Sequence, residues 1–225
     1  MQAVAKEIVE KLGELSTSCI SDALDKIGIE GALFGIKGQT NKKRICGQAF
    51  TVHYVPCGAI KGTVGDFLDE VEAGQVVVID NSGRCDCTVW GGIMAHVSNH
   101  KKLSGTLIDG VCRDISEINK ADYAVFSKGT YMRTGKDRVE VDYINKPVSV
   151  SGIHVSPGDL IVGDENGAVC IPLEYVEKVY EIAMQIDKAE NNIVAETSNG
   201  SSLKAAREKY GYHQLQSHTE GGSLK

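Results

Sequence analysis

The spacing of apolar residues divides the chain into helical and extended segments. Near both ends of the chain, apolar residues recur every three or four positions, which is the period of an amphipathic helix. Serines that can cap a helix and glycines that can end one indicate where several of these helices begin and end. This pattern predicts helices over residues 2–13, between the cap at 16–18 and Gly28, and over residues 63–73, 91–101, 115–120, 173–197 and 201–210.

The middle of the chain has the shorter periods of β-strands. Residues 48–55 alternate apolar and polar side chains, as a half-buried strand does, while 76–80 and 106–109 are apolar runs typical of strands covered on both faces. Because these strands alternate with helices as far as about residue 126, they predict crossover units in a partly parallel sheet. Five shorter strands separated by turns follow, over residues 139–143, 148–151, 153–155, 160–163 and 168–171.

These elements predict a single α/β domain over residues 1–210. Its length of 225 residues is enough to bury a core without disulfides or structural metals. Residues 173–210 are expected to form a C-terminal helical arm. Residues 211–225 lack periodicity and are expected to be a flexible tail.

Composition narrows the classes of function. The net charge of −6 argues against nucleic-acid binding, which needs a basic face. No segment resembles a signal peptide or a membrane span, and the seven cysteines are odd in number and scattered. We therefore expect a cytoplasmic protein whose cysteines are reduced, with Cys85-Asp86-Cys87 forming a loop rather than a zinc site.

Two neighbouring segments carry the candidate chemistry. Residues 90–96 (Trp-Gly-Gly-Ile-Met-Ala-His) open a helix with glycines, so its first backbone N–H groups are available to an anion. The buried strand that follows ends in Arg113-Asp114, which offers a guanidinium to a carboxylate and an oxygen ligand to a hard cation. Taken alone, an Arg-Asp pair is often only a surface ion pair. Together, the two segments suit a small anionic oxo acid held beside a divalent metal.

These residues and several flanking motifs resemble the RraA-like family, which includes metal-dependent 4-hydroxy-4-methyl-2-oxoglutarate aldolases and regulators of ribonuclease E activity. The resemblance runs from about residue 18 to 202. A glycine, twenty intervening residues and then Arg-Asp, here Gly92 to Arg113-Asp114, is its signature. The other segments that carry it are residues 21–24, 47–52, 74–80, 108–112 and 158–164.

The resemblance implies a three-layer β/β/α sandwich with a mixed sheet, assembled as a homotrimer or hexamer with active sites between subunits. It implies that Arg113 binds the carboxylate and keto oxygen of the substrate and that Asp114 ligates Mg²⁺ or Mn²⁺. The backbone amides of Gly92, Ile93 and Met94 would hold the pyruvoyl carboxylate. Glu190 would reach the metal shell of a neighbouring subunit.

The expected reaction accounts for these residue types. Retro-aldol cleavage of a 4-hydroxy-2-oxo acid and decarboxylation of oxaloacetate both leave the enolate of pyruvate, so negative charge develops on the keto oxygen. A divalent cation and an arginine stabilise that charge. No lysine for a Schiff base lies in the matched motifs. We therefore expect a lyase with oxaloacetate decarboxylase activity and no nucleic-acid or membrane partner.

One departure leaves a second interpretation open. Confirmed aldolases tend to carry an acid at the position of Gly92, and its absence here also fits a non-catalytic regulator of a ribonuclease or another macromolecule. His96 lies one helical turn after Gly92 and is a candidate base, although a lone histidine on a helix is more often structural. Methyltransferase is a third name used in this family, but the sequence has no glycine-rich nucleotide loop that would support it.

Several further residues are ambiguous in the sequence. Asn81, at the end of a buried strand, either lines the site or belongs to an ordinary turn. Asp164 and Asn166 are expected to form a turn, and Trp90 to lie in the core or an interface. The cations of residues 128–138 either meet a second carboxylate of the substrate or lie on a solvated loop; they are Lys128, Arg133, Lys136 and Arg138.

Overall fold

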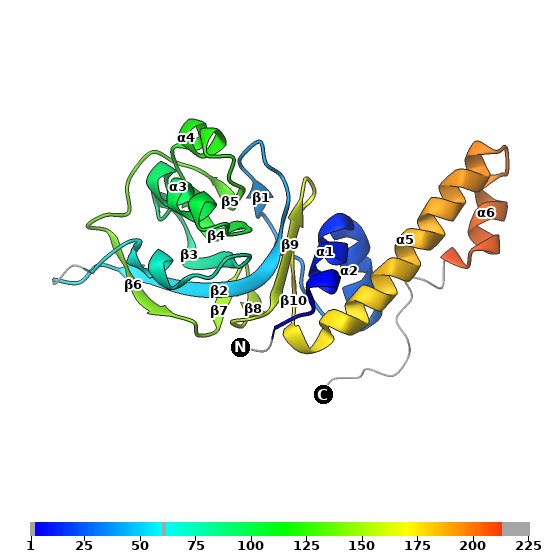
Figure 1. Cartoon of the computed structure of the whole chain (residues 1–225), viewed down its shortest axis with the longest axis horizontal. Coiled ribbons are helices and arrows are strands. Elements are labelled where there is room, and N and C mark those ends of the chain that lie inside the picture. Colours follow the sequence, from blue (N-terminus) through cyan, green and yellow to red (C-terminus); the bar gives the residue numbers. More distant parts are fainter. Residues whose placement is uncertain (1–2, 60–61, 213–225) are drawn as a thin grey trace.

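A computed structural model describes residues 3–59 and 62–212 (Figure 1). Its helices are α1 (Lys6–Glu14), α2 (Thr17–Lys26), α3 (Gly92–His100), α4 (Ile115–Lys120), α5 (Val176–Ser198) and α6 (Leu203–Lys209), with 3₁₀ turns η1 (Asp66–Glu70) and η2 (Leu173–Tyr175). Its strands are β1 (Lys37–Gly38), β2 (Ile45–Pro56), β3 (Val76–Thr88), β4 (Gly105–Cys112), β5 (Val125–Thr130), β6 (Val139–Ile144), β7 (Val148–Val150), β8 (Ile153–Val155), β9 (Leu160–Asp164) and β10 (Gly167–Ile171).

One mixed sheet organises the domain. Its strand order is β1-β5-β4-β3-β2-β9-β10, and β6 also pairs with β2. Strands β2, β3, β4 and β5 are parallel to one another, whereas β1, β6, β9 and β10 join antiparallel. The long strand β2 pairs with β9 through its first residues and with β3 and β6 through its later ones, so it links the two halves of the sheet. The predicted α/β class with a partly parallel sheet is confirmed.

Three groups of buried side chains hold the layers together. One lies between the parallel strands and the α3–α4 side, and a second lies between the same strands and the β7–β8 hairpin. The third packs α1, α2 and α5 against β9 and β10. In Figure 1, helices α3 and α4 cover one face of the sheet, β7 and β8 lie on the other, and α5 extends away from the sheet with α6 at its far end. This is the expected β/β/α arrangement with a C-terminal helical arm.

Two predicted elements differ from the structure. The helix expected over residues 63–73 is only the 3₁₀ turn η1, because Val71 is already extended and this lets Phe67, Leu68 and Val71 all reach the core. Strand β3 continues to Thr88 instead of ending near residue 80, with register shifts on both sides of Arg84. Ser82 and Gly83, both with positive φ, form the irregular turn that the sequence did not reveal.

The structure also confirms that Trp90 lies in the core, as predicted. Trp90 is buried and stacks on Tyr123, with 6.1 Å between ring centroids. All seven cysteines are free thiols. In the part of the chain that is described, no helix is long and apolar enough to cross a membrane. Of the tail predicted to be flexible, residues 213–225 lie outside the described residues.

Candidate active site

Arg113 and Asp114 leave the sheet at the carboxyl end of β4. The Arg113 N–H donates to the carbonyl oxygen of Trp90 at 3.1 Å, so the exit of β4 is joined to the segment that leads into α3. Asp114 has left-handed backbone angles (φ 61°, ψ 38°) and is the residue before α4. A non-glycine residue in this region costs free energy, and such strain is frequent at functional sites. The turn brings the Asp114 side chain back toward the start of α3.

The Asp114 carboxylate is only lightly bound within the chain. One of its oxygens, Oδ2, accepts the Gly92 N–H at 3.2 Å and lies 3.5 Å from Arg113 Nε. Its side chain is 42% exposed. A Cβ on Gly91 would lie 2.7 Å from the same oxygen, so only glycine leaves room for the carboxylate in this position. Asp114 therefore retains acceptor capacity for a ligand.

The N-terminus of α3 offers backbone donors beside this carboxylate. Gly91 is the N-cap and has no side chain to occupy the first amides of the helix. The N–H groups of Ile93 and Met94 fall in the first turn, where an α-helix provides no intrahelical acceptor. The Gly92 amide, by contrast, is already bonded to Asp114. Of the three amides predicted to bind a carboxylate, those of Ile93 and Met94 are the available pair.

Glu117 is a further candidate site residue, which no motif in the sequence singled out. A Cβ placed on Gly92 would lie 2.9 Å from the Glu117 Cβ, so the stem of this glutamate covers the position where a side chain at residue 92 would begin. Its carboxylate is half exposed and pairs with Lys120 at 2.7 Å. The signal in the sequence was its spacing, three residues after Asp114 on the same helical face. The stem of an acidic residue therefore lies beside Gly92, although it comes from α4 and its carboxylate contacts Lys120.

Two other predicted site residues, His96 and Asn81, differ in solvent exposure. His96 is exposed one turn along α3, and its imidazole has no hydrogen bond or ion pair to any described residue. Asn81 is only 1% exposed, and neither Oδ1 nor Nδ2 has a hydrogen-bond partner in the described part of the chain. Gly110 makes room for it, since a Cβ there would lie 3.3 Å from Asn81 Nδ2. A buried amide without partners is suited to a ligand or an ordered water.

Glu190 lies in a different part of the same chain. It is on α5, which packs on α2 beyond β9 and β10, whereas α3 and α4 cover the other half of the sheet (Figure 1). Burial, and then the charges of Asp22 and Asp187, raise the pKa of the Glu190 carboxyl above its ordinary value. Within one chain Glu190 does not join Arg113 and Asp114, so the prediction that it reaches the site of a neighbouring subunit stays a prediction.

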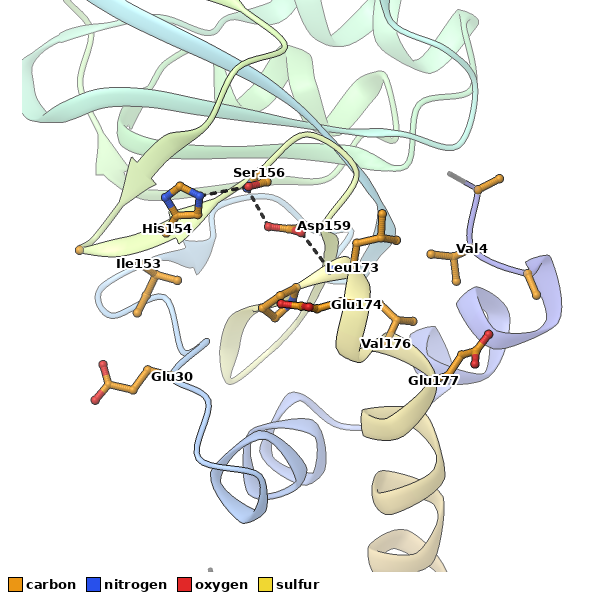
Figure 2. A pocket seen from close by; sticks show the side chains of 14 residues that line it. Val4, Glu30, Ile153, His154, Ser156, Asp159, Leu173, Glu174, Val176 and Glu177 are labelled. Carbon is orange, nitrogen blue, oxygen red and sulfur yellow. Dashed lines mark hydrogen bonds between the residues drawn. The ribbon is translucent and has the colours of Figure 1, made fainter. Parts of the chain in front are cut away.

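A large cavity elsewhere contains none of these residues. It measures about 860 Å³ and lies between the N-terminal segment, the β7–β8 hairpin and the start of α5 (Figure 2). His154 Nε2 lies 3.1 Å from Ser156 Oγ, but the Asp159 carboxylate accepts the backbone N–H groups of Ser156 and Leu173 at 2.7 and 2.9 Å. Asp159 therefore anchors backbone, and the three side chains do not form a hydrolytic triad.

Comparison with known proteins shows which family this chain resembles. The sequence profile of the family described as RraA-like (Aldolase/RraA) matches residues 17–170. Protein DlpA of Legionella pneumophila is 37% identical over 92% of this chain, which spans about a third (34%) of that relative's length. A protein of Halalkalibacterium halodurans, named as a candidate 4-hydroxy-4-methyl-2-oxoglutarate aldolase, is 29% identical over 90% of this chain and 95% of its own. The crystal structure of an uncharacterized protein from Pseudomonas syringae superposes with a TM-score of 0.84 at 39% identity, covering 92% of this chain and all of that one.

Proposed function

This chain belongs to the RraA-like family, and from that premise we propose that it is a divalent-metal-dependent lyase. Its substrate is a 4-hydroxy-2-oxo acid of the 4-hydroxy-4-methyl-2-oxoglutarate type, cleaved to pyruvate and a second carbonyl compound. Decarboxylation of oxaloacetate is the expected side activity, because it leaves the same pyruvate enolate. The observation that carries the proposal is the meeting of Arg113, Asp114 and the N-terminus of α3.

The pyruvoyl half of the substrate fits these groups. The Ile93 and Met94 amides bind its carboxylate and fix its orientation, since the first turn of a helix attracts an anion. The Arg113 guanidinium donates to the keto oxygen and stabilises the negative charge that develops there on cleavage. Asn81, buried with a free amide, is the candidate to orient the bound substrate or a water beside it.

The donors present fit Mg²⁺ or Mn²⁺ held largely by water. Among residues 3–59 and 62–212, no three His, Cys, Asp or Glu side chains gather into a metal cage. Mg²⁺ is commonly bound by only one or two carboxylates and keeps several waters. Asp114, half exposed and lightly bonded, is the carboxylate that would hold it. When bound, the cation supplies Lewis-acid stabilisation of the keto oxygen.

Glu117 is our candidate for the proton-transferring group. In this chain it occupies the space next to Gly92, where the aldolases of the family tend to carry an acid. Its carboxylate would accept the proton of the C4 hydroxyl, directly or through a water, as the C3–C4 bond breaks. This assignment removes the main argument for a non-catalytic regulator, the missing acid at residue 92. His96 remains the alternative base.

Assembly completes the proposal. A homotrimer or hexamer would bring Glu190 of one subunit to the metal shell of the next. Sedimentation that shows only a monomer would exclude this contribution from Glu190.

Pyruvate release from oxaloacetate tests the function. Wild-type protein and the Asp114→Ala variant are assayed with and without Mg²⁺ or Mn²⁺. We expect metal-dependent release from the wild type and release at background from the variant. Release that ignores both the metal and the substitution would contradict the proposal. A wild type without release, but with a protein partner in a pull-down, would favour the regulatory interpretation.

A further inference from the structure

The cations of residues 128–138 differ in whether their charge is free to meet a substrate. Lys128 Nζ lies 2.5 Å from Asp109 Oδ1, so its charge is already paired. The Arg138 guanidinium donates to the carbonyl oxygens of Thr134 and Lys136 at 3.1 and 3.3 Å and thereby holds the loop. Arg133 and Lys136 have side chains without a hydrogen bond or ion pair to any described residue. Of the four cations, these two have no such contact, although Arg133, after Arg84, also helps to lower the pKa of the nearby Asp86 carboxyl.

The path of the chain separates Arg133 from Lys136. Thr130 pairs with Cys112 on the β5 side of β4, and the Tyr131 N–H donates to the Cys112 carbonyl oxygen at 2.9 Å. Three residues further on, Thr134 forms a parallel bridge with Thr88 at the end of β3. Thr88 also pairs with Val111 of β4.

A residue paired with two strands has them on opposite sides. Because Val111 lies on one side of Thr88, Thr134 must lie on the other. Residues 131–133 therefore pass across the ends of β4 and β3. These are the strand ends from which Arg113 and the Gly91–Gly92 segment emerge.

The crossing is held tightly. The Thr88 N–H donates to the Arg133 carbonyl oxygen at 2.9 Å. A Cβ on Gly135 would lie 2.4 Å from the Thr88 carbonyl oxygen, so the loop there packs backbone against backbone. Arg133 is thus fixed at its main chain while its side chain is exposed. Lys136 lies beyond the crossing.

We propose that Arg133 recognises a carboxylate on C4 of the substrate and makes the enzyme selective for 4-hydroxy-2-oxo diacids. This inference rests on the proposed lyase function. An arginine suits the task because its planar guanidinium binds a carboxylate through two parallel hydrogen bonds. Arg113 binds the pyruvoyl end, and Arg133 binds the end that leaves as the second product. In the reaction the C3–C4 bond breaks, the C4 hydroxyl gives up its proton, and C3 takes a proton to form pyruvate.

Two substrates that differ only at C4 test this assignment. 4-Hydroxy-2-oxoglutarate carries a carboxylate on C4 and yields glyoxylate, whereas 4-hydroxy-2-oxopentanoate carries a methyl group and yields acetaldehyde. We expect Arg133→Gln to lower kcat/KM for the diacid by about 10- to 100-fold, the worth of a charge-assisted hydrogen bond. It should change kcat/KM for the methyl substrate by less than about twofold. Arg133→Lys should recover part of the loss, and Lys136→Gln, which removes the same charge from the same loop, should leave both substrates unchanged.

The outcomes separate this inference from the function beneath it. An equal loss for both substrates, no loss for either, or the selective loss in Lys136→Gln would each overturn the role of Arg133. Exchange of the pyruvate methyl protons in D₂O reports the enolate half of the reaction without a C4 group. If wild type catalyses that exchange while Arg133→Gln does not alter selectivity, only the assignment of Arg133 fails. If wild type catalyses neither exchange nor cleavage, the proposed function fails and the assignment falls with it.

Discussion

Asp114 and Asp164 both follow buried strands, yet the structure uses their carboxylates in opposite ways. Asp164, at the end of β9, is 2% exposed. It accepts the Thr17 N–H and hydroxyl at 2.8 and 2.7 Å and the Asn166 N–H at 2.8 Å. Asp114, after β4, is half exposed and accepts one amide at 3.2 Å. A carboxylate whose oxygens are filled by the protein holds the fold together, and one left with open acceptor positions is available to a ligand.

The comparison also shows how each position is made. The Asp164 carboxylate ties the buried start of α2 to the β9–β10 turn, through donors of Thr17 and Asn166. Asp114 is instead held in a left-handed conformation beside two consecutive glycines, Gly91 and Gly92. Asp164 therefore stabilises the fold, whereas Asp114 carries backbone strain.

After the loss of Asp114, replacing Glu117 by Gln should have the largest effect on turnover, because it removes the carboxylate of the residue packed on Gly92 without changing its size. We expect kcat to fall about 100-fold, the usual worth of one acid–base group, with an unchanged melting temperature. Lys120→Gln is the matched control, since it breaks the Glu117–Lys120 pair but keeps the carboxylate. Steady-state pyruvate release from a 4-hydroxy-2-oxo acid checks both variants. Equal turnover in Glu117→Gln and wild type would remove Glu117 from the mechanism and return attention to His96.

Replacing Asp164 by Ala should have the largest effect on stability. It leaves the buried N–H and hydroxyl of Thr17 without an acceptor and removes the bond to the Asn166 N–H, so we expect a loss of about 3 kcal/mol in the free energy of unfolding. Activity per folded molecule should be retained. Urea denaturation measures the first quantity and a specific-activity assay below the melting temperature measures the second.

The stability due to Asp164 should also depend on pH in a defined direction. Burial alone would raise the pKa of this carboxyl, but the hydrogen bonds from Thr17 and Asn166 outweigh it and hold the pKa below its ordinary value. The stabilisation is therefore present above the unfolded-state pKa of about 3.9 and is lost as pH falls through the lower folded-state pKa. Wild type and Asp164→Ala should converge in stability toward that acidic limit. A difference independent of pH would show that the carboxylate is not the source.

Replacing Gly91 by Ala tests whether the position of the Asp114 carboxylate matters. The backbone of Gly91 is extended, so alanine is allowed there, but its Cβ would lie 2.7 Å from Asp114 Oδ2 and must displace it. We expect activity to fall about 10-fold, as small misplacements of catalytic groups commonly cost that much or more. Gly129→Ala is the control, because no atom lies within 4 Å of its added Cβ. Full activity in Gly91→Ala would mean that the Asp114 carboxylate can be displaced without loss of activity.

The smallest effect is expected at Glu190, a third acidic residue with yet another environment. Its raised pKa means that the ionised form is disfavoured in the fold, so Glu190→Gln should raise the melting temperature slightly at pH 7. The gain should shrink as pH falls through the raised folded-state pKa and vanish below the ordinary glutamate pKa of about 4.3. Calorimetry at two pH values measures this. A variant that is less stable at pH 7 would instead show that a cation outside this chain, such as a metal in a neighbouring subunit, holds Glu190.

The sequence predicts what local physics decides. The helix starts at Ser16 and Ser202 are signalled by capping hydroxyls, which accept the N–H groups of Cys19 and Ala205 at 3.1 and 3.2 Å. The parallel strands are signalled by their apolar runs. The turn at Asp164 was also predicted, because such residues accept backbone N–H groups two positions on.

The sequence does not reveal what packing between distant elements decides. The second half of β3 is polar and bulged, so no periodicity marks it. Glu117 lies against Gly92 only because α4 packs beside α3, and the crossing by residues 131–133 depends on bridges from Thr88 to both of its neighbours. The sequence thus nominated most residues of the candidate site, while the packing of Glu117 against Gly92 and the crossing by residues 131–133 needed the structure.

Binding of Mn²⁺ tests the central contrast most directly, by the effect of the bound ion on the relaxation of water protons. Wild type, Asp114→Asn and Asp164→Asn are titrated with Mn²⁺ well below their melting temperatures. We expect Asp114→Asn to lose the bound ion, whereas Asp164→Asn should keep wild-type affinity despite its lower stability. Wild-type Mn²⁺ affinity in Asp114→Asn would contradict the claim that this carboxylate is the one left open for a metal.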